Sequence, residues 1–132
     1  MCIRDRYDTV LATAERLRGD PCIVFLMIGG GKRFDELADA VKMRGLDGAF
    51  RFMPYQPRAM LPLSLAVPDA HWLSLNPKLE GLIVPSKFYG IAAAGKPIVV
   101  IADPDGELAQ LVRQHACGLA IAPGDALSLI HI

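Results

Sequence analysis

The chain has 132 residues, 52% of them hydrophobic, so it can bury one core but is too short for two full domains. Its 14 basic and 14 acidic residues give a formal net charge of zero, so no global field attracts the chain to nucleic acid or an anionic membrane. The scattered Cys2, Cys22 and Cys117 lack the spacing of a disulfide framework or a zinc site. We interpret Cys22 and Cys117 as buried small residues, and we expect a soluble protein with no nucleic-acid partner, no cofactor and no metal.

The two ends of the chain are interpreted as foreign sequence. Residues 1–6 and residues 127–132 can be encoded by DNA stretches that are reverse complements of one another, and both look like translated adaptor from a sequencing library. We therefore exclude both ends from fold reasoning and treat residues 7–126 as a partial domain. The alternative is a genuine basic start and a genuine terminal strand at residues 127–132.

From residue 7 onward, helical and strand patterns alternate. Apolar residues recur at helical spacing over residues 7–17, and the continuous apolar run at residues 22–28 is typical of a parallel strand covered on both faces. The later elements are read in the same way. We predict helices at residues 34–41, 58–66 (kinked or restarted at Pro62), 85–94 and 107–115, and strands at residues 50–53, 70–75, 98–101 and 119–122.

This alternation predicts an α/β fold, with a Rossmann-like, doubly wound parallel sheet. Ligands of such sheets bind beyond the carboxyl ends of the strands. That rule points to the loops at residues 29–32, 54–57, 76–84 and 102–106.

The glycine run at residues 29–31 follows a strand and invites a phosphate-binding interpretation. Leu26 and Arg33 occupy positions where a P-loop needs Gly and Ser or Thr, and Phe34 occupies a position where a dinucleotide fingerprint needs Gly. A tight turn at the edge of a ligand cleft is therefore favoured over a direct phosphate cradle. Gly30 is kept as a candidate donor-binding residue.

The segment at residues 79–87 is more specific. Pro85 suits the first position of a helix, and Val84 before it offers no capping oxygen, so the first N–H groups are free for an anion. Gly81 admits a ligand to the backbone, Glu80 can accept hydrogen bonds from sugar hydroxyls, and Lys87 can place a positive charge near a diphosphate. In the alternative interpretation, Ser86 caps its own helix, Lys87 is solvated and Glu80 is a loop charge.

Other polar residues have weaker signals. Tyr55 and Gln56 follow a strand that ends at the expected cleft, and they are candidates for a base-binding rim or for an ordinary surface turn. His71 is interpreted as structural, because no partner carboxylate or serine stands at a recognisable spacing. His115 lies near the carboxyl end of a predicted helix, where its interaction with the helix dipole is favourable.

The residues at 80–81 and 85–87, with the helix that ends Ala-Ala-Gly-Lys-Pro-Ile-Val, resemble the donor-binding region of glycosyltransferase family 4. The resemblance runs from about residue 7 to residue 125 and is strongest to enzymes of bacterial exopolysaccharide, colanic acid and O-antigen synthesis. It implies one half of a two-domain GT-B fold in a parent protein that performs retaining transfer. The sugar would pass from a nucleoside diphosphate, usually UDP, to a glycan or lipid-linked acceptor held by an N-terminal domain upstream of residue 7.

The resemblance also implies residue roles. Glu80 matches the acidic residue that touches the donor sugar, and the backbone at Gly81 and Leu82 would face the sugar and the phosphate, next to Pro85 and Ser86. We expect metal-independent donor binding, a cytoplasmic location with peripheral contact to the inner membrane through the missing half, and no transferase activity in the isolated chain.

The chain departs from the family pattern at one position. The family usually has a second glutamate that holds the ribose, five residues before Gly95, but Gly90 stands there, and the usual seven-residue spacing reaches Phe88. Two alternatives therefore stay open. One is a non-catalytic nucleotide-binding module, and the other is a nucleotide-sugar epimerase of similar fold, which would need His and carboxylates in the cleft.

Overall fold

The structure is a computed structural model that describes residues 5–130, so the expected adaptor residues 1–4 and 131–132 lie outside the described residues. Its helices are α1 (Asp5–Arg16), α2 (Lys32–Met43), α3 (Leu61–Ala66), α4 (Ser86–Ala93), α5 (Glu107–Gln114) and α6 (Ala126–Ile130). Its strands are β1 (Phe25–Ile28), β2 (Phe50–Met53), β3 (His71–Ser74), β4 (Ile98–Ile101) and β5 (Gly118–Ile121). The short 3-10 helices η1 (Arg58–Met60) and η2 (Pro77–Leu79) complete the described elements.

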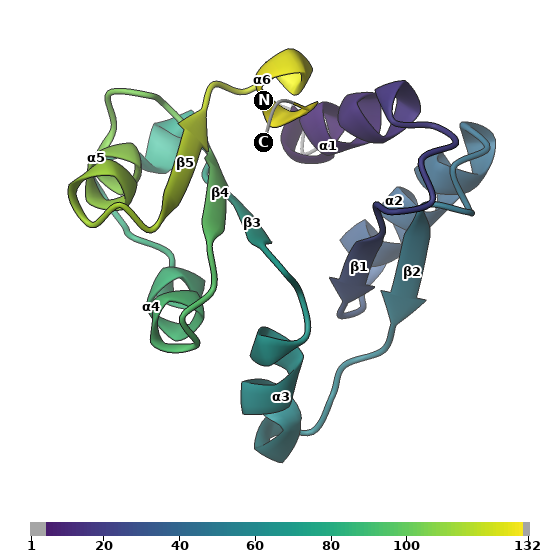
Figure 1. Ribbon diagram of the computed structural model, residues 1–132, viewed down its shortest axis with the longest axis horizontal. Helices are drawn as coiled ribbons and strands as arrows, with labels where there is room; N and C mark the ends of the chain where they lie inside the picture. Colours follow the sequence, from purple (N-terminus) through teal and green to yellow (C-terminus); the bar gives the residue numbers. More distant parts are fainter. Residues whose placement is uncertain (1–4, 131–132) are drawn as a thin grey trace.

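The strands are all paired in parallel and alternate with helices, which confirms the predicted α/β, Rossmann-like class. They form two sheets, however, where one continuous sheet was expected. β1 pairs with β2, and β3, β4 and β5 pair in that order, with no ladder joining the two sheets in the described residues. Figure 1 shows the two sheets on opposite sides of the molecule, with α1 bridging them and α3 at the far end.

The three-stranded sheet is covered on both faces, as the sequence of its central strand predicts. Successive side chains of a strand point to opposite faces. Ile98 and Val100 of β4 pack into one core with residues of α4 and α5, whereas Val99 and Ile101 pack into a second core with α1. Each of these four side chains is buried. This half of the chain is therefore doubly wound.

The two-stranded sheet is less well covered than expected. The strand begins at Phe25, whereas a strand over residues 22–28 was expected. Val24 is 52% exposed and Cys22 is also exposed, so the interpretation of Cys22 as buried is wrong, while Cys117 is half-buried. The physical reason is that β1 has a ladder partner only in β2 within the described chain, and hydrophobicity alone does not create a second covering layer.

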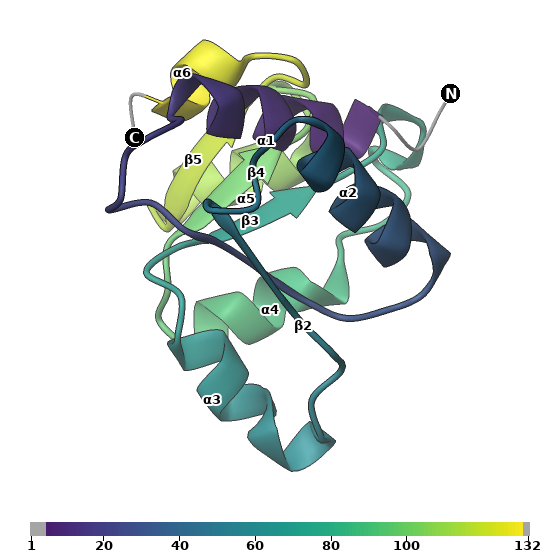
Figure 2. The same ribbon diagram turned by 90° about the vertical axis from the view of Figure 1, so that its right-hand side faces the viewer.

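Helix α1 holds the two sheets together. Val10, Leu11 and Ala14 lie on its buried face and share one hydrophobic core with Phe50 of β2 and Ile101 of β4. Figure 2, turned by 90°, shows α1 lying across the sheets with α6 beside it. The spacing of these apolar residues fits one face of an α-helix, as the sequence predicts.

The end of the chain is tied to α1 by one buried hydroxyl. Thr9 is 1% exposed, and its Oγ1 accepts a hydrogen bond of 2.8 Å from the N–H of Gly124, just before α6. We expect Thr9→Val to destabilise the fold by about 1–3 kcal/mol, because it leaves that N–H without its acceptor. Urea unfolding of Thr9→Val beside Thr9→Ser, which keeps the hydroxyl, measures this; equal loss in both variants would contradict it.

Helix α6 includes residues of the segment interpreted as adaptor. Residues 127–130 are helical, so the alternative of a terminal strand is wrong for them. The Ser128 hydroxyl and N–H both donate to the Asp125 carboxylate, and the hydroxyl has the larger effect in lowering the pKa of Asp125. These hydrogen bonds close the first turn of α6.

Candidate functional site

The glycine turn after β1 lies against Tyr55. Gly31 begins α2 with φ 91°, a left-handed conformation that glycine adopts without strain, and no side chain caps this helix end. A Cβ built on Gly30 would stand 3.3 Å from the ring of Tyr55. The turn is thus tight and glycine-dependent, and the otherwise exposed Tyr55 ring packs beside it. Gln56, by contrast, donates from its amide to the carbonyl of Pro54, 2.9 Å away.

The loop that carries Glu80 is anchored on both sides. It leaves β3 through Asn76, whose Oδ1 accepts from the N–H of Lys78 at 3.0 Å and so starts η2. Leu79 before Glu80 and Val84 after it both pack against the core between the three-stranded sheet and α4 and α5. The backbone around Glu80 is therefore fixed from two directions.

The carboxylate of Glu80 has an unusual environment. Both of its oxygens are buried, and neither has a hydrogen-bond donor among the described residues. Buried polar atoms are nearly always paired, because an unpaired charged group loses its hydration without compensation. Such an atom indicates a missing partner, and a carboxylate needs a donor such as a hydroxyl or an N–H group.

The carboxylate lies against Gly106, the residue that begins α5. A Cβ built on Gly106 would stand 2.7 Å from the Cγ of Glu80 and even closer to its carboxyl group. No side chain caps this end of α5. The free first-turn N–H groups and the helix dipole favour a negative charge there. The sequence places Gly106 in one of the loops expected near the ligand, at residues 102–106, but does not predict this contact, because nothing in the spacing brings Glu80 and Gly106 together.

The backbone after Glu80 is open to a ligand. Gly81 has φ 75°, and a Cβ there would meet no atom within 4 Å. Leu82 follows and is 74% exposed. The N–H groups of Leu82 and Ile83 already donate to the carbonyl of Leu79, at 3.1 and 3.3 Å, so the open space in this loop is beside Gly81 itself.

Helix α4 begins one residue later than predicted. Pro85 is its N-cap, with ψ 130°, and the first helical residue is Ser86. Because Pro85 has no side-chain oxygen, this end is uncapped, and the alternative in which Ser86 caps the helix is wrong. Ser86 and Lys87 are exposed, and Lys87 makes no ion pair with any described residue. The free cation thus stands in the first turn of an uncapped helix.

His71, His115 and Gly90 lie in three different environments. His71 has its Nε2 2.9 Å from the carbonyl oxygen of Leu65, which fits the structural role predicted for it. His115 is the C-cap residue of α5, as its position in the sequence indicated. Gly90 lies within α4, where a Cβ would be 3.6 Å from Leu65. The structure therefore leaves room for a small side chain at the position where the family usually has a glutamate.

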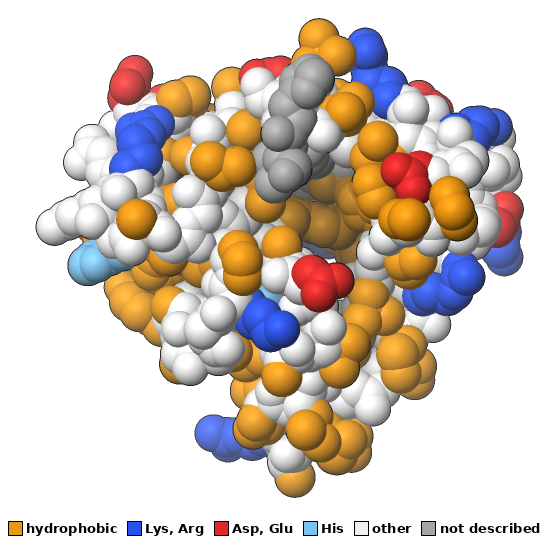
Figure 3. Space-filling view, in the orientation of Figure 1, with side chains coloured by type: hydrophobic (Ala, Val, Ile, Leu, Met, Phe, Trp, Pro, Cys, Tyr) orange, Lys and Arg blue, Asp and Glu red, His pale blue; other side chains and the backbone are white. Residues whose placement is uncertain are grey.

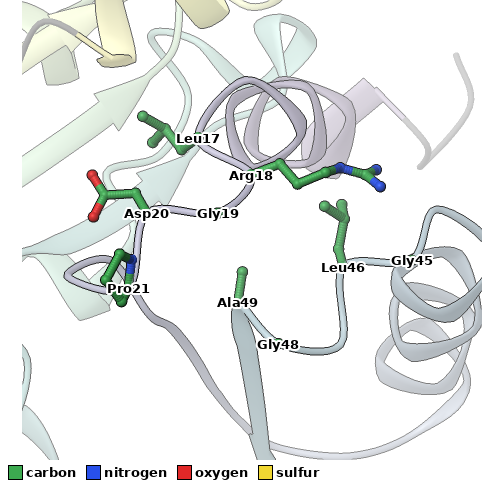
Figure 4. A pocket seen from close by; sticks show the side chains of 9 residues that line it. All are labelled: Leu17, Arg18, Gly19, Asp20, Pro21, Gly45, Leu46, Gly48 and Ala49. Atoms are coloured by element: carbon green, nitrogen blue, oxygen red, sulfur yellow. The ribbon is translucent and has the colours of Figure 1, made fainter.

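A cavity of about 380 Å³ lies away from these residues. It is bounded by residues 17–21, which precede β1, and by residues 45, 46, 48 and 49, which precede β2 (Figure 4). It therefore lies at the amino ends of these strands, whereas ligands of parallel sheets bind at the carboxyl ends. The guanidinium of Arg18, in its wall, donates to the carbonyl of Arg44 at 2.6 Å. We do not assign the candidate site to this cavity.

The described residues offer neither a metal-binding cluster nor a helix able to cross a membrane. No three His, Cys, Asp or Glu side chains there come together in a way that could hold a metal ion. None of the helices in residues 5–130 has the length and apolar character needed to cross a membrane.

Comparison with known proteins gives two relatives. A protein of Escherichia coli (strain K12), named as a colanic acid biosynthesis glycosyl transferase (WcaI), is 32% identical over 114 residues, which are 86% of this chain and 27% of the relative. A protein of Pseudomonas aeruginosa, named as a glycosyltransferase (WbjE), is 27% identical over 128 residues, which are 95% of this chain and 31% of the relative. No protein-family model matches. The chain spans less than a third of either relative, and over that span it is glycosyltransferase-like at the family level.

Proposed function

We propose that this chain is the donor-binding half of a retaining glycosyltransferase, part of a longer cytoplasmic protein of cell-surface polysaccharide synthesis. The parent moves a sugar from a nucleoside diphosphate, most simply UDP, to a glycan or lipid-linked acceptor held by another domain. The names of the two relatives support the transferase class. Alone, the chain binds the donor and does not turn it over, because the acceptor is held elsewhere.

The observation that carries the proposal is the buried, unpartnered carboxylate of Glu80. It sits beside a loop with an exposed backbone at Gly81 and shortly before an uncapped helix that carries the free cation Lys87. A carboxylate suits the hydroxyls of a sugar, and a helix N-terminus with a lysine suits a diphosphate. One short segment therefore has groups for both ends of a nucleotide sugar.

In this proposal, the chain contributes binding and charge stabilisation to the reaction. The first-turn N–H groups of α4 and the ammonium of Lys87 stabilise the negative charge on the diphosphate as its bond to the sugar breaks. Glu80 orients the sugar through a hydroxyl, which holds the reacting carbon in place for the acceptor. The turn at Gly30 and the ring of Tyr55 form a candidate surface for the base.

The second candidate is a nucleotide-binding module without transferase activity, and the observation that favours it is Gly90. No carboxylate stands at that position in α4, so the chain lacks there the glutamate that the family resemblance implies for holding the ribose. Transfer by the full-length parent separates the two candidates, because a binding module retains affinity for the nucleotide and shows no turnover with any acceptor.

Removing either charged group is expected to weaken donor binding. We expect Glu80→Ala and Lys87→Ala each to lower the affinity for UDP-glucose by about tenfold or more, the loss expected for a hydrogen bond to a charged group. Lys87→Ala also lowers the affinity for UDP, whereas Glu80→Ala does not, because UDP lacks the transferred sugar that Glu80 is proposed to contact. Calorimetric titration of the 132-residue chain measures both ligands.

Two exposed residues on α2 serve as controls for these variants. Lys42→Ala and Glu36→Ala remove the same charges from a helix outside the candidate site and are expected to leave both affinities unchanged. A folded wild-type chain that binds neither UDP nor UDP-glucose would exclude donor binding by this half alone. Equal weakening by the control variants would show that net charge, and not the site, determines affinity.

A further inference from the structure

We infer that Gly106 is a positioning residue for Glu80. Its missing side chain creates the recess at the start of α5 in which the carboxylate is held. The inference rests on the proposed function for the role of Glu80, but the contact itself is a property of the fold. It identifies what sets the position of the sugar-binding carboxylate in a loop that lies far from Gly106 in sequence.

The Glu80 side chain fills the space that a side chain at position 106 would occupy. The nearest atoms to a Cβ built there are the carboxyl carbon, Oε1 and Cγ of Glu80, with Cγ at 2.7 Å. All three belong to one flexible side chain and none to the backbone. Gly106 itself is buried, so the recess is part of the packed interior. An added methyl group and the observed Glu80 carboxylate therefore exclude each other.

The backbone of Gly106 does not explain why a glycine is there. Its φ of −75° and ψ of 166° lie in a region that any residue adopts. Its carbonyl accepts from the N–H of Gln110 at 3.0 Å, an ordinary first helical hydrogen bond. A side chain at position 106 is thus disfavoured by the space that the Glu80 carboxylate occupies and not by the backbone conformation.

The electrostatics favour the same arrangement. The carboxylate lies at the amino end of α5, which no side chain caps, and the helix dipole gives that end a partial positive charge that attracts carboxylate oxygens. Both oxygens still lack hydrogen-bond donors in the described chain, so a sugar hydroxyl that reaches the carboxylate finds both acceptors unpaired. Gly106 therefore allows the carboxylate to lie close to the helix end.

The test is Gly106→Ala in the 132-residue chain, with Glu80→Ala and the double variant. Gly48→Ala is the matched control, because a Cβ at Gly48 meets no atom within 4 Å. Gly106→Ala is expected to lower the affinity for UDP-glucose by about tenfold and to leave the affinity for UDP unchanged. The reason is that displacing the carboxylate removes a charged hydrogen bond that only the transferred sugar makes. In the Glu80→Ala background, the same substitution changes neither affinity.

A general loss of structure would lower the affinities for UDP and UDP-glucose together, so a change in their ratio is specific to positioning. If Gly106→Ala leaves the ratio of the affinities for UDP-glucose and UDP at its wild-type value, while Glu80→Ala abolishes the preference for UDP-glucose, the inference is wrong and the proposed function survives. If the wild-type chain binds neither ligand, the proposed function fails, and urea unfolding of the four chains decides the inference. The inference is supported if the changes in unfolding midpoint caused by Gly106→Ala and Glu80→Ala do not add up to the change in the double variant. It is overturned if they do.

Discussion

Gly118→Ala is expected to destabilise the chain by more than about 4 kcal/mol, which is most of the stability of a small domain. Gly118 is the first residue of β5 and stands opposite Ile98 in the parallel ladder with β4. A Cβ built on it would lie 2.7 Å from the carbonyl carbon and 2.8 Å from the amide nitrogen of Ile98, and closer still to the carbonyl oxygen. These are backbone atoms of the central strand, so they cannot move without breaking the ladder.

The measurement is urea unfolding followed by circular dichroism, with Gly48→Ala as the control. That control makes the same chemical change in open space, so it isolates the clash with β4 from any effect of adding a methyl group. The expected outcome is a chain that is unfolded, or unfolds at very low urea, only for the variant at Gly118. A midpoint close to that of the wild-type chain would show that β4 and β5 do not approach as closely as described.

Leu11→Ala is expected to have the second largest effect, about 2–5 kcal/mol, the usual range for removing a buried leucine side chain. Leu11 is 2% exposed and lies on the face of α1 that packs into the core shared by both sheets. In the described chain the two sheets have no ladder in common, so this core is what couples them. The cavity left by the substitution therefore weakens the connection between the halves as well as each half.

Two optical probes distinguish these effects. Trp72 of β3 packs against the core shared by both sheets, so its fluorescence follows the packing of that core, while circular dichroism reports all helices and strands. Coincident transitions in the wild-type chain and separated transitions in Leu11→Ala are the expected result. Met43→Ala is the control, because Met43 is 89% exposed. Loss of stability of the same size in both variants would contradict a special role for α1.

Most of the local structure could be predicted from the sequence, because local patterns determine it. The run at residues 98–101 is apolar throughout and forms a strand buried on both faces. The positions expected for the helices in the second half differ from the structure by one or two residues, as with α4, which starts at Ser86 because Pro85 keeps an extended ψ. Hydrophobic periodicity and the placement of glycine and proline carry this information.

The parts that could not be predicted depend on contacts between distant segments. The division into two sheets is invisible in a list of strands, because each strand pattern is compatible with any neighbour. The exposure of Cys22 follows from that division and not from its own apolar surroundings in sequence. Likewise, the motif predicts that Glu80 is a binding residue, but only the fold shows that its carboxylate lies against Gly106.

The gap between the two sheets also affects how the chain behaves at high concentration. Within the described residues, one side of β1 and one side of β3 carry backbone N–H and C=O groups with no ladder partner. The space-filling view shows a hollow on this face, with hydrophobic side chains around it (Figure 3). Unpaired backbone groups at a strand edge can form hydrogen bonds with an extended strand of another molecule. In a concentrated sample, the most abundant such molecule is another copy of the same chain. We therefore expect the chain to self-associate through these strand edges as its concentration rises.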